Sequence, residues 1–263
     1  MDLRQVSIGI KTFLRDAKLL NTIAAISRTM PEVTMIIADC GDHSEEKDGI
    51  YADMAREGHT ILQMPFDAGF GAMSNAIAGA LKTEYLLIGS DDFDFNPPSV
   101  RKGIEELASV LDATDIDIAS GRLRGPYEFT LEDLGDTIIE HRVETLTSPP
   151  RPWYIECDLT VNYSLIKKRV FEKVSWDSDV KIGGGEHGAF FVDVKRASLI
   201  VAYVPGVQIS EQVGEDSERF KQFRARASNK SRPCFDRRGI RKYVLGTGQV
   251  DYEKVDYPEP HTR

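Results

Sequence analysis

The sequence predicts an α/β fold with a mostly parallel sheet flanked by helices. Continuous apolar runs of strand length, such as residues 33–38 and 85–90, alternate with amphipathic segments of helix length up to about residue 120. That alternation is typical of parallel strands joined by crossover helices. The runs are apolar throughout, so we expect both faces of the sheet to be covered.

The first half of the chain supplies the clearest elements. Residues 5–10 should form a buried strand, and Asp16 offers an N-cap to the helix that follows. In each expected helix, apolar residues recur three or four positions apart and therefore share one face. The elements expected in order are strand 5–10, a helix with Leu19, Ile23 and Ile26, strand 33–38, a short helix with Ile50 and Met54, strand 60–64, a helix with Met73, Ile77 and Leu81, strand 85–90, a helix with Val100, Ile104, Leu107 and Leu111, and a strand at 115–120.

The second half has a weaker pattern. Residues 121–155 are expected to be mostly loops, and order returns with an apolar stretch at 154–166 and a helix at 167–174. A last strand at 199–204 should end at Pro205, because proline cannot donate to a strand ladder. We place a domain boundary after residue 214, followed by a basic C-terminal extension, 215–263, whose last dozen residues should fray.

Composition indicates a globular protein in a reducing compartment. The 263 residues are 41% hydrophobic and 29% charged, which argues against disorder. The three cysteines are far apart and form no CxxC pair, so neither a disulfide framework nor a zinc knuckle is expected. The apolar runs are too short for a membrane span, and the first residues lack the pattern of a signal peptide, so we expect a cytoplasmic protein.

Charge is segregated along the chain. The net charge is −9, yet residues 219–242 contain ten Lys or Arg and one acid, a local charge of +9. This segment could neutralise the phosphates of a small diphosphate or of a nucleic-acid backbone. A solvated surface is the usual alternative for such a run. Aromatic residues interleave with the charges, so we favour phosphate binding.

Three carboxylates follow the fourth strand directly, at Asp91, Asp92 and Asp94. Polar clusters also follow the first strand (KTFLR) and the second (DCGD), and parallel strands bring their carboxyl ends to one edge, so these clusters should converge on one pocket. Packed acids resist desolvation unless a cation lies among them, and oxygen ligands suit Mg²⁺ or Mn²⁺. The alternative is a turn whose aspartates cap the next helix, which does not explain Asp91 and Asp92.

Two further places offer site residues. Asp39, at the end of the second strand, could accept hydrogen bonds from a nucleobase or ribose, although Asp42 and Ser44 could simply cap the next helix. Glu186 and His187 follow three glycines and enter a helix, and either could be a general base. The alternative for Glu186 is an acid favoured by the helix dipole, which leaves the glycines unexplained.

These motifs, taken in order, resemble a family 2 type glycosyltransferase of the GT-A fold, a Rossmann-like nucleotide-sugar-binding fold. The nearest resemblance is to the beta-1,4-N-acetylgalactosaminyltransferase type domain. It covers about residues 5–211 and is carried by VSIGIKTFLR, VTMIIADCGD, YLLIGSDDFDF, DLTVNYSLIKKRVFEKVSWD and GGGEHGAFFVDVKRASLIVAYVPGV. Within 1–214, the resemblance implies a donor-binding half, 1–96, and an acceptor-side half, 97–214.

The resemblance implies transfer of a sugar, with inversion, from a UDP-sugar to a hydroxyl, assisted by Mn²⁺ or Mg²⁺. It implies a donor site and a metal site at the ends of the strands, and a general base near the second glycine-rich loop. The residues carried over are Thr12, Arg15, Asp39, Gly69 and Asp91 for the donor, Asp92, Asp94 and Glu211 for the metal, and His187 or Glu186 for catalysis.

The chain departs from the family pattern at three places. Ser90 replaces the first acid of the usual DxD run, which moves the metal to Asp92 and Asp94. Ala189 stands where relatives carry an acid before the paired aromatics, and His187 stands where relatives with a GED element have the base aspartate. This favours His187 as the base over Glu186. Where a metal-binding histidine often follows the last strand, this chain offers Glu211.

Several functions share parts of this pattern. A nucleotidyltransferase acting on sugar phosphates would share the fold class, the acids and the metal, but it normally has a glycine-rich phosphate loop that KTFLR lacks. A nucleic-acid-binding protein could use residues 219–242. For a glycosyltransferase, the acceptor could be a saccharide or a hydroxylated base in DNA bound through 219–242.

Overall fold

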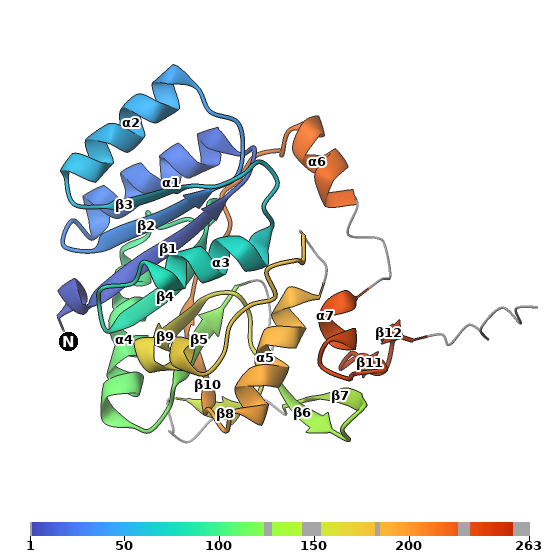
Figure 1. The fold of residues 1–263 in the computed structure, drawn as a ribbon. Coiled ribbons are helices and arrows are strands. Elements are labelled where there is room, and N and C mark those ends of the chain that lie inside the picture. Colours follow the sequence, from blue (N-terminus) through green and yellow to red (C-terminus); the bar gives the residue numbers. More distant parts are fainter. Residues whose placement is uncertain (1, 124–127, 144–153, 182–184, 226–231, 255–263) are drawn as a thin grey trace, which may run out of the picture.

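The computed structural model describes residues 2–123, 128–143, 154–181, 185–225 and 232–254. Its centre is an eight-stranded sheet in the order β3-β2-β1-β4-β9-β5-β10-β8. Strands β3, β2, β1 and β4 are parallel, β9 runs antiparallel between β4 and β5, and β10 is parallel to β5. The α/β fold expected from the sequence is confirmed (Figure 1).

Most elements of the first half lie where the sequence places them. The fourth strand, β4, spans Tyr85–Ser90, and its apolar run is buried on both faces as expected. The other elements of this half are β1 (Val6–Thr12), α1 (Asp16–Thr29), β2 (Thr34–Asp39), α2 (Glu45–Arg56), β3 (Thr60–Gln63), α3 (Phe70–Gly79), α4 (Pro98–Ala113) and β5 (Ile118–Arg122). Asp16 is the first residue of α1 and not its cap, because Arg15 holds the N-cap position and the Asp16 carboxylate binds Lys47 instead.

The sheet separates two apolar cores. Helices α1, α2 and α4 cover one face, where Ile8 and Ile10 of β1 point. Helix α3 and helix α5 (Glu186–Arg196) cover the other face, in contact with Leu86 and Ile88 of β4. Both faces are therefore buried, in agreement with the continuous apolar runs.

The second half contains strands that the sequence pattern did not reveal. Residues expected to be loops form a hairpin of β6 (Phe129–Asp133) and β7 (Thr137–Arg142). The C-terminal strands β11 (Lys242–Val244) and β12 (Val250–Glu253) complete a second sheet in the order β12-β11-β7-β6, with β11 parallel to β7. These short strands are partly exposed and carry charged residues, so no continuous apolar run marks them.

Two other expectations were wrong in detail. The predicted helix at 167–174 is a short 3-10 helix, η2 (Lys168–Glu172), preceded by β9 (Ser164–Lys167). The predicted strand 199–204 is β10 (Val201–Gln208), which continues through Pro205. Proline is tolerated there because the register with β5 shifts between Tyr203 and Gln208, and the pairing with β8 (Ile155–Cys157) ends at Tyr203. The short helices α6 (Glu218–Ala225) and α7 (Pro233–Asp236) lie in the C-terminal extension.

Gly71, in the first turn of α3, allows this helix to approach the loop before α5. A Cβ atom at Gly71 would lie 1.9 Å from the carbonyl oxygen of Asp177, which is backbone and cannot rotate away. Gly71→Ala should therefore lower the free energy of unfolding by about 1–3 kcal/mol, the usual range for overpacking. Urea denaturation measures this loss.

Gly79 provides the matched control, because it lies in the same helix and its Cβ would meet nothing within 4 Å. Gly79→Ala should leave stability equal or slightly raised, since alanine is the better helix former. Equal midpoints for the two variants would show that the close approach at Gly71 does not constrain the fold.

Candidate functional site

The carboxyl ends of β1, β2 and β4 meet at one edge of the large sheet, as the sequence predicts. In the parallel ladders, Thr12 pairs with Asp39 and Lys11 pairs with Ser90. The polar residues after these three strands are thereby brought together. Ligands in open parallel sheets bind at this edge, which makes it the candidate site.

The cation among the clustered aspartates is the guanidinium of Arg15. Its terminal nitrogens lie 2.5 Å from an oxygen of Asp91 and 2.7 Å from an oxygen of Asp92. The hydroxyl of Thr12 donates to Asp91 over 2.9 Å. Phe220 of α6 packs against the guanidinium, 4.5 Å from its carbon to the ring centroid. Three predicted donor-site residues, Thr12, Arg15 and Asp91, thus form one buried network.

The two aspartates differ in their electrostatics. Asp91 is fully buried, and this burial together with the charge of Asp92 raises its pKa to about 6, although Arg15 and Thr12 act in the opposite direction. For Asp92, burial is outweighed by Arg15, so its pKa is lowered and the carboxylate is ionised at neutral pH. The Asp92 side chain is 14% exposed and that of Asp91 is not exposed. Asp91 therefore positions Arg15, and Asp92 is the carboxylate that faces the surface.

Asp39 is also buried, and its carboxylate is engaged by the protein itself. It accepts hydrogen bonds from the Tyr51 hydroxyl at 2.7 Å and the Gly41 backbone N–H at 2.8 Å, and it pairs with Lys47 at 2.8 Å. These contacts tie α2 to the end of β2. Ser44 caps α2 by accepting from the Lys47 N–H, as one alternative from the sequence expects.

Gly69 stands at the start of α3 with a positive φ of 98°. A Cβ at this position would lie 2.7 Å from the carbonyl oxygen of Val180. Glycine is thus required both by the backbone angle and by the close approach of another loop. The role of Gly69 in donor binding stays a prediction.

Glu186 and His187 lie in the first turn of α5. The Nε2 atom of His187 is 2.5 Å from the carbonyl oxygen of Thr160. Because a carbonyl oxygen only accepts, Nε2 carries the hydrogen and Nδ1 is the basic nitrogen of the neutral ring. Burial lowers the pKa of His187 to about 4, and the charge of Lys11 contributes to this shift. His187 is therefore neutral at pH 7.

Lys11 is the functional residue that the sequence reasoning missed. It is the penultimate residue of β1, and its ammonium group interacts electrostatically with Glu186, Asp91 and Asp92. These three charges oppose the burial that lowers the pKa of Lys11. Lys11 thus joins the aspartate cluster to the first turn of α5. A polar residue one position before the end of a buried strand was the available signal.

Gln212, just after the last strand of the large sheet, is a second missed residue. Its side-chain amide donates to the carbonyl oxygen of Asp91 at 3.1 Å and to the Thr22 hydroxyl at 2.7 Å. Its backbone N–H donates to the carbonyl oxygen of Asp92 at 2.6 Å. Gln212 therefore fixes the backbone that presents both aspartates.

The three predicted metal ligands, Asp92, Asp94 and Glu211, have different partners in the structure. The Asp94 carboxylate accepts from the backbone and side chain of Asn96, and Glu211 forms a backbone bridge with Phe93. Across the described parts of the chain, no three His, Cys, Asp or Glu side chains gather closely enough to hold a metal by themselves. Asp92, ionised and partly exposed, still fits a cation whose other ligands are substrate phosphates, as is common for Mg²⁺.

Six of the basic residues that the structure describes in segment 219–242 are paired with acids of the same chain, while Arg226 and Lys230 lie outside the described residues. Arg219 pairs with Asp42 beside the carboxyl ends of β1 and β2, where α6 lies (Figure 1). The other basic residues with ion pairs are Lys221, Arg232, Arg237, Arg238 and Lys242. This pairing lowers the charge that the segment can offer to a nucleic-acid backbone.

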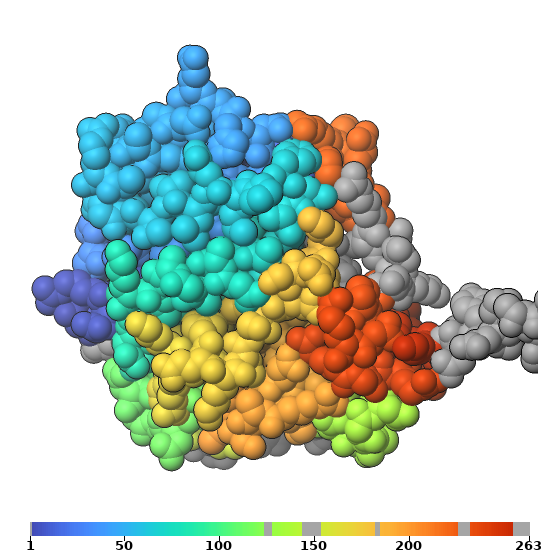
Figure 2. All heavy atoms as spheres, viewed as in Figure 1, coloured from blue at the N-terminus to red at the C-terminus, as the bar shows by residue number. Residues whose placement is uncertain are grey.

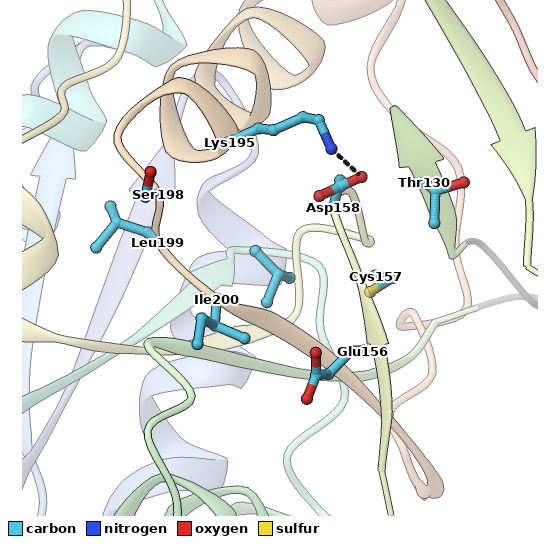
Figure 3. Close-up of a pocket in the computed structure, with 9 residues that line it drawn as sticks. Thr130, Glu156, Cys157, Asp158, Lys195, Ser198, Leu199 and Ile200 are labelled. Carbon is cyan, nitrogen blue, oxygen red and sulfur yellow. Dashed lines mark hydrogen bonds and ion pairs between the residues drawn. The ribbon is translucent and has the colours of Figure 1, made fainter. Parts of the chain in front are cut away.

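Among the cavities lined by described residues, three differ in their position relative to this edge. One of about 180 Å³ is formed by Arg15 and Lys18 with residues 215–217. A second, of about 230 Å³, adjoins Glu186 and His187. The largest, of about 460 Å³, lies at the amino end of β10 beside the Lys195–Asp158 ion pair (Figure 3). This last cavity is at the opposite edge of the sheet and does not belong to the candidate site.

Sequence comparison finds relatives among sugar-transferring enzymes. The chain is 30% identical over 215 residues, 79% of its length, to mouse beta-1,4 N-acetylgalactosaminyltransferase 2. It is 37% identical over 119 residues to human beta-1,4 N-acetylgalactosaminyltransferase 1. The chain covers 39% and 20% of these two relatives, less than half of each. No family profile matches the chain.

Structural comparison finds the same fold in solved structures of S. aureus TarS. S. aureus TarS in complex with UDP-GlcNAc matches 80% of this chain and 60% of its own, with a TM-score of 0.55 and 9% identity. TarS 1-349 matches 79% of this chain with a TM-score of 0.53 and 10% identity. The GT-A fold expected from the sequence is confirmed. Among the described residues, no helix combines the length and apolar character needed to cross a bilayer.

Proposed function

We propose that this chain, a GT-A fold glycosyltransferase related to the beta-1,4-N-acetylgalactosaminyltransferases, transfers a sugar from a UDP-sugar to an acceptor hydroxyl with inversion. The observation that carries the proposal is the charged cluster of Lys11, Arg15 and Asp92 at the carboxyl edge of the sheet. The similarity to two N-acetylgalactosaminyltransferases and to TarS in complex with UDP-GlcNAc supports sugar transfer over nucleotidyl transfer.

The donor diphosphate would lie at this edge, beside the two cations of β1 and the loop after it. Lys11 supplies an ammonium group. Arg15 is held by Asp91, whose carboxylate also accepts a hydrogen bond from the Thr12 hydroxyl. Groups fixed in advance stabilise charge that develops on a leaving group without reorganising. A divalent cation held by Asp92 and the phosphate oxygens would neutralise further charge there.

The acceptor would be activated from the opposite side by His187. Its neutral Nδ1 accepts the proton of the acceptor hydroxyl while the oxygen attacks the anomeric carbon and the bond to the diphosphate breaks. UDP leaves with the bonding electron pair, and attack opposite to it inverts the anomeric configuration. Glu186, close to Lys11, is then a residue that orients the acceptor or the ammonium group.

A coupled assay of UDP release tests this proposal. The full chain is supplied with UDP-GalNAc or UDP-GlcNAc, then with the GDP- and CDP-linked sugars, each with and without Mn²⁺ and a panel of saccharide acceptors. We expect UDP release from UDP-sugars and an inverted anomeric centre in the product by NMR. A retained configuration, or equal turnover of the GDP- and CDP-sugars, would refute the mechanism.

Lys11→Met should weaken UDP binding at least tenfold while preserving the fold. A hydrogen bond to a charged group is worth about 1.5–3 kcal/mol, and methionine keeps the length of the side chain without its charge. Titration calorimetry with UDP measures the change. Lys102→Met is the control, because Lys102 is exposed on α4. This helix covers the face of the large sheet opposite to α3 and α5. Equal affinities for the two variants would remove Lys11 from the donor site.

A further inference from the structure

The cavity of about 230 Å³ lies between the large domain and the C-terminal strands. Its walls come from the first turn of α5, from α7, and from β7, β11 and β12. In the space-filling view, the red C-terminal region lies directly against the yellow and orange region that contains α5 (Figure 2). The cavity therefore adjoins His187.

The walls of this cavity are preorganised by buried polar contacts. Glu140 of β7 is 6% exposed, and its two oxygens accept from the Tyr243 hydroxyl at 2.8 Å and from the Gly246 backbone N–H at 2.9 Å. Tyr243 stacks on Phe235 of α7, with ring centroids 4.7 Å apart and planes inclined by 10°. Both rings are buried, so they hold the wall in place and their faces are already covered.

The close packing of α5 against this wall depends on a glycine. A Cβ at Gly188 would lie 3.1 Å from the Tyr243 hydroxyl oxygen. The first turn of α5 can approach β11 because this side chain is missing. Glu186 and His187 are thereby held at the mouth of the cavity.

The charges around the cavity disfavour an anionic ligand. Three carboxylates line it, from Glu140, Glu186 and Asp251, against one guanidinium, that of Arg232. Arg232 is 11% exposed and is already paired with Asp251 at 3.3 Å. A phosphate or carboxylate group would meet net repulsion here, whereas the hydroxyls of a sugar can donate to carboxylates and accept from a guanidinium.

The size of the cavity limits the ligand further. The volume of the cavity is about 230 Å³. That space admits a single hexose ring. It is below the usual range of about 300–1,000 Å³ for larger ligands such as a nucleotide.

We propose that this cavity binds a neutral hexose residue of a saccharide acceptor, which places the C-terminal strands in acceptor recognition. The inference rests on the proposed sugar transfer, because it assigns the substrate whose hydroxyl reaches His187. The basic extension then serves a saccharide acceptor and not a nucleic acid.

Binding and kinetics with charge-altered variants test the inference. Asp251→Asn removes one carboxylate of the wall, and Glu253→Gln is the matched control, since Glu253 lies in the same strand, 60% exposed, paired with Lys242. The probes are methyl β-galactoside, methyl β-glucoside and methyl β-glucuronide, measured by saturation-transfer NMR and as acceptors. Leu245→Phe fills part of the cavity without changing its charge.

We expect at least one neutral hexoside to bind and the glucuronide to bind at least tenfold more weakly. Asp251→Asn and Leu245→Phe should each raise the acceptor KM at least tenfold. The KM for the UDP-sugar and its slow hydrolysis without acceptor should stay unchanged, as should all values for Glu253→Gln. The inference is overturned if no neutral hexoside binds, if the glucuronide binds equally well, or if Asp251→Asn and Glu253→Gln behave alike. Hexoside binding without any UDP release would contradict the transfer reaction and leave the cavity assignment standing.

Discussion

Arg15→Met should lower the free energy of unfolding by about 3–5 kcal/mol, the usual loss when one partner of a buried ion pair is removed. The guanidinium is 6% exposed and contacts two carboxylates, of which Asp91 is entirely buried. Methionine keeps much of the packing against Phe220 but removes the guanidinium that contacts both Asp91 and Asp92. Urea denaturation, followed by circular dichroism, measures the loss as a lower midpoint.

Arg56→Met is the control for this experiment. Arg56 also pairs with an aspartate, Asp53, but the two side chains are 77% and 64% exposed. Exposed pairs contribute about 0–1 kcal/mol, so this variant should stay within that range of the wild type. Should both variants lose the same stability, Arg15 would not be the cation that makes the aspartate cluster tolerable.

His187→Gln should lower kcat by about 10²–10⁴-fold, the usual contribution of a general base, with UDP affinity unchanged. Glutamine can still donate to the Thr160 carbonyl but cannot accept a proton at neutral pH. The pKa of His187 is lowered to about 4, chiefly by burial. The base is active when unprotonated, so the part of kcat that depends on His187 should be complete at pH 8 and be lost as the pH drops through 4.

Two variants control the histidine experiment. His43→Gln changes a histidine that is 39% exposed and should leave kcat unchanged. Glu186→Gln changes the neighbouring carboxylate and should cost less than His187→Gln. A His187→Gln enzyme with near wild-type kcat, or a larger loss in Glu186→Gln, would move the general base away from His187.

Protonation of His187 also changes the free energy of unfolding. The pKa of His187 is depressed in the folded state from an ordinary value near 6.5 to about 4. Between these two values the unfolded chain binds a proton that the folded chain does not, so stability falls as the pH is lowered through this window. The contribution is fully present above about pH 6.5.

The sequence predicted the donor-side half of the fold well because that half follows simple periodicities. The strand Tyr85–Ser90 is a continuous apolar run, and parallel pairing alone brings Lys11 and Thr12 to the residues after β2 and β4. The second sheet could not be predicted in this way. Its strands are three to six residues long, and β11 pairs with a strand about a hundred positions earlier.

Prediction from the sequence was also incomplete for the aspartate cluster at the strand ends. The sequence shows that three carboxylates need a cation, but it does not show which group supplies it. In the structure Arg15 fills that place, three residues after Thr12 along the loop. The same holds for Asp39. Its partners Lys47 and Tyr51 lie in α2, and the sequence does not show that this helix packs against the end of β2. Partners of buried charges are set by tertiary packing, which periodicity does not encode.

Crystals of the full chain soaked with UDP and Mn²⁺ test most directly where the donor diphosphate binds, which is the central claim. The claim predicts that the diphosphate lies at the carboxyl edge of β1 and β4, within contact of Lys11 and Asp92. The cavity of about 460 Å³ lies at the opposite edge of the same sheet, so the two locations cannot be confused. Nucleotide density at that opposite edge, with the Lys11 and Asp92 edge empty, would contradict the account.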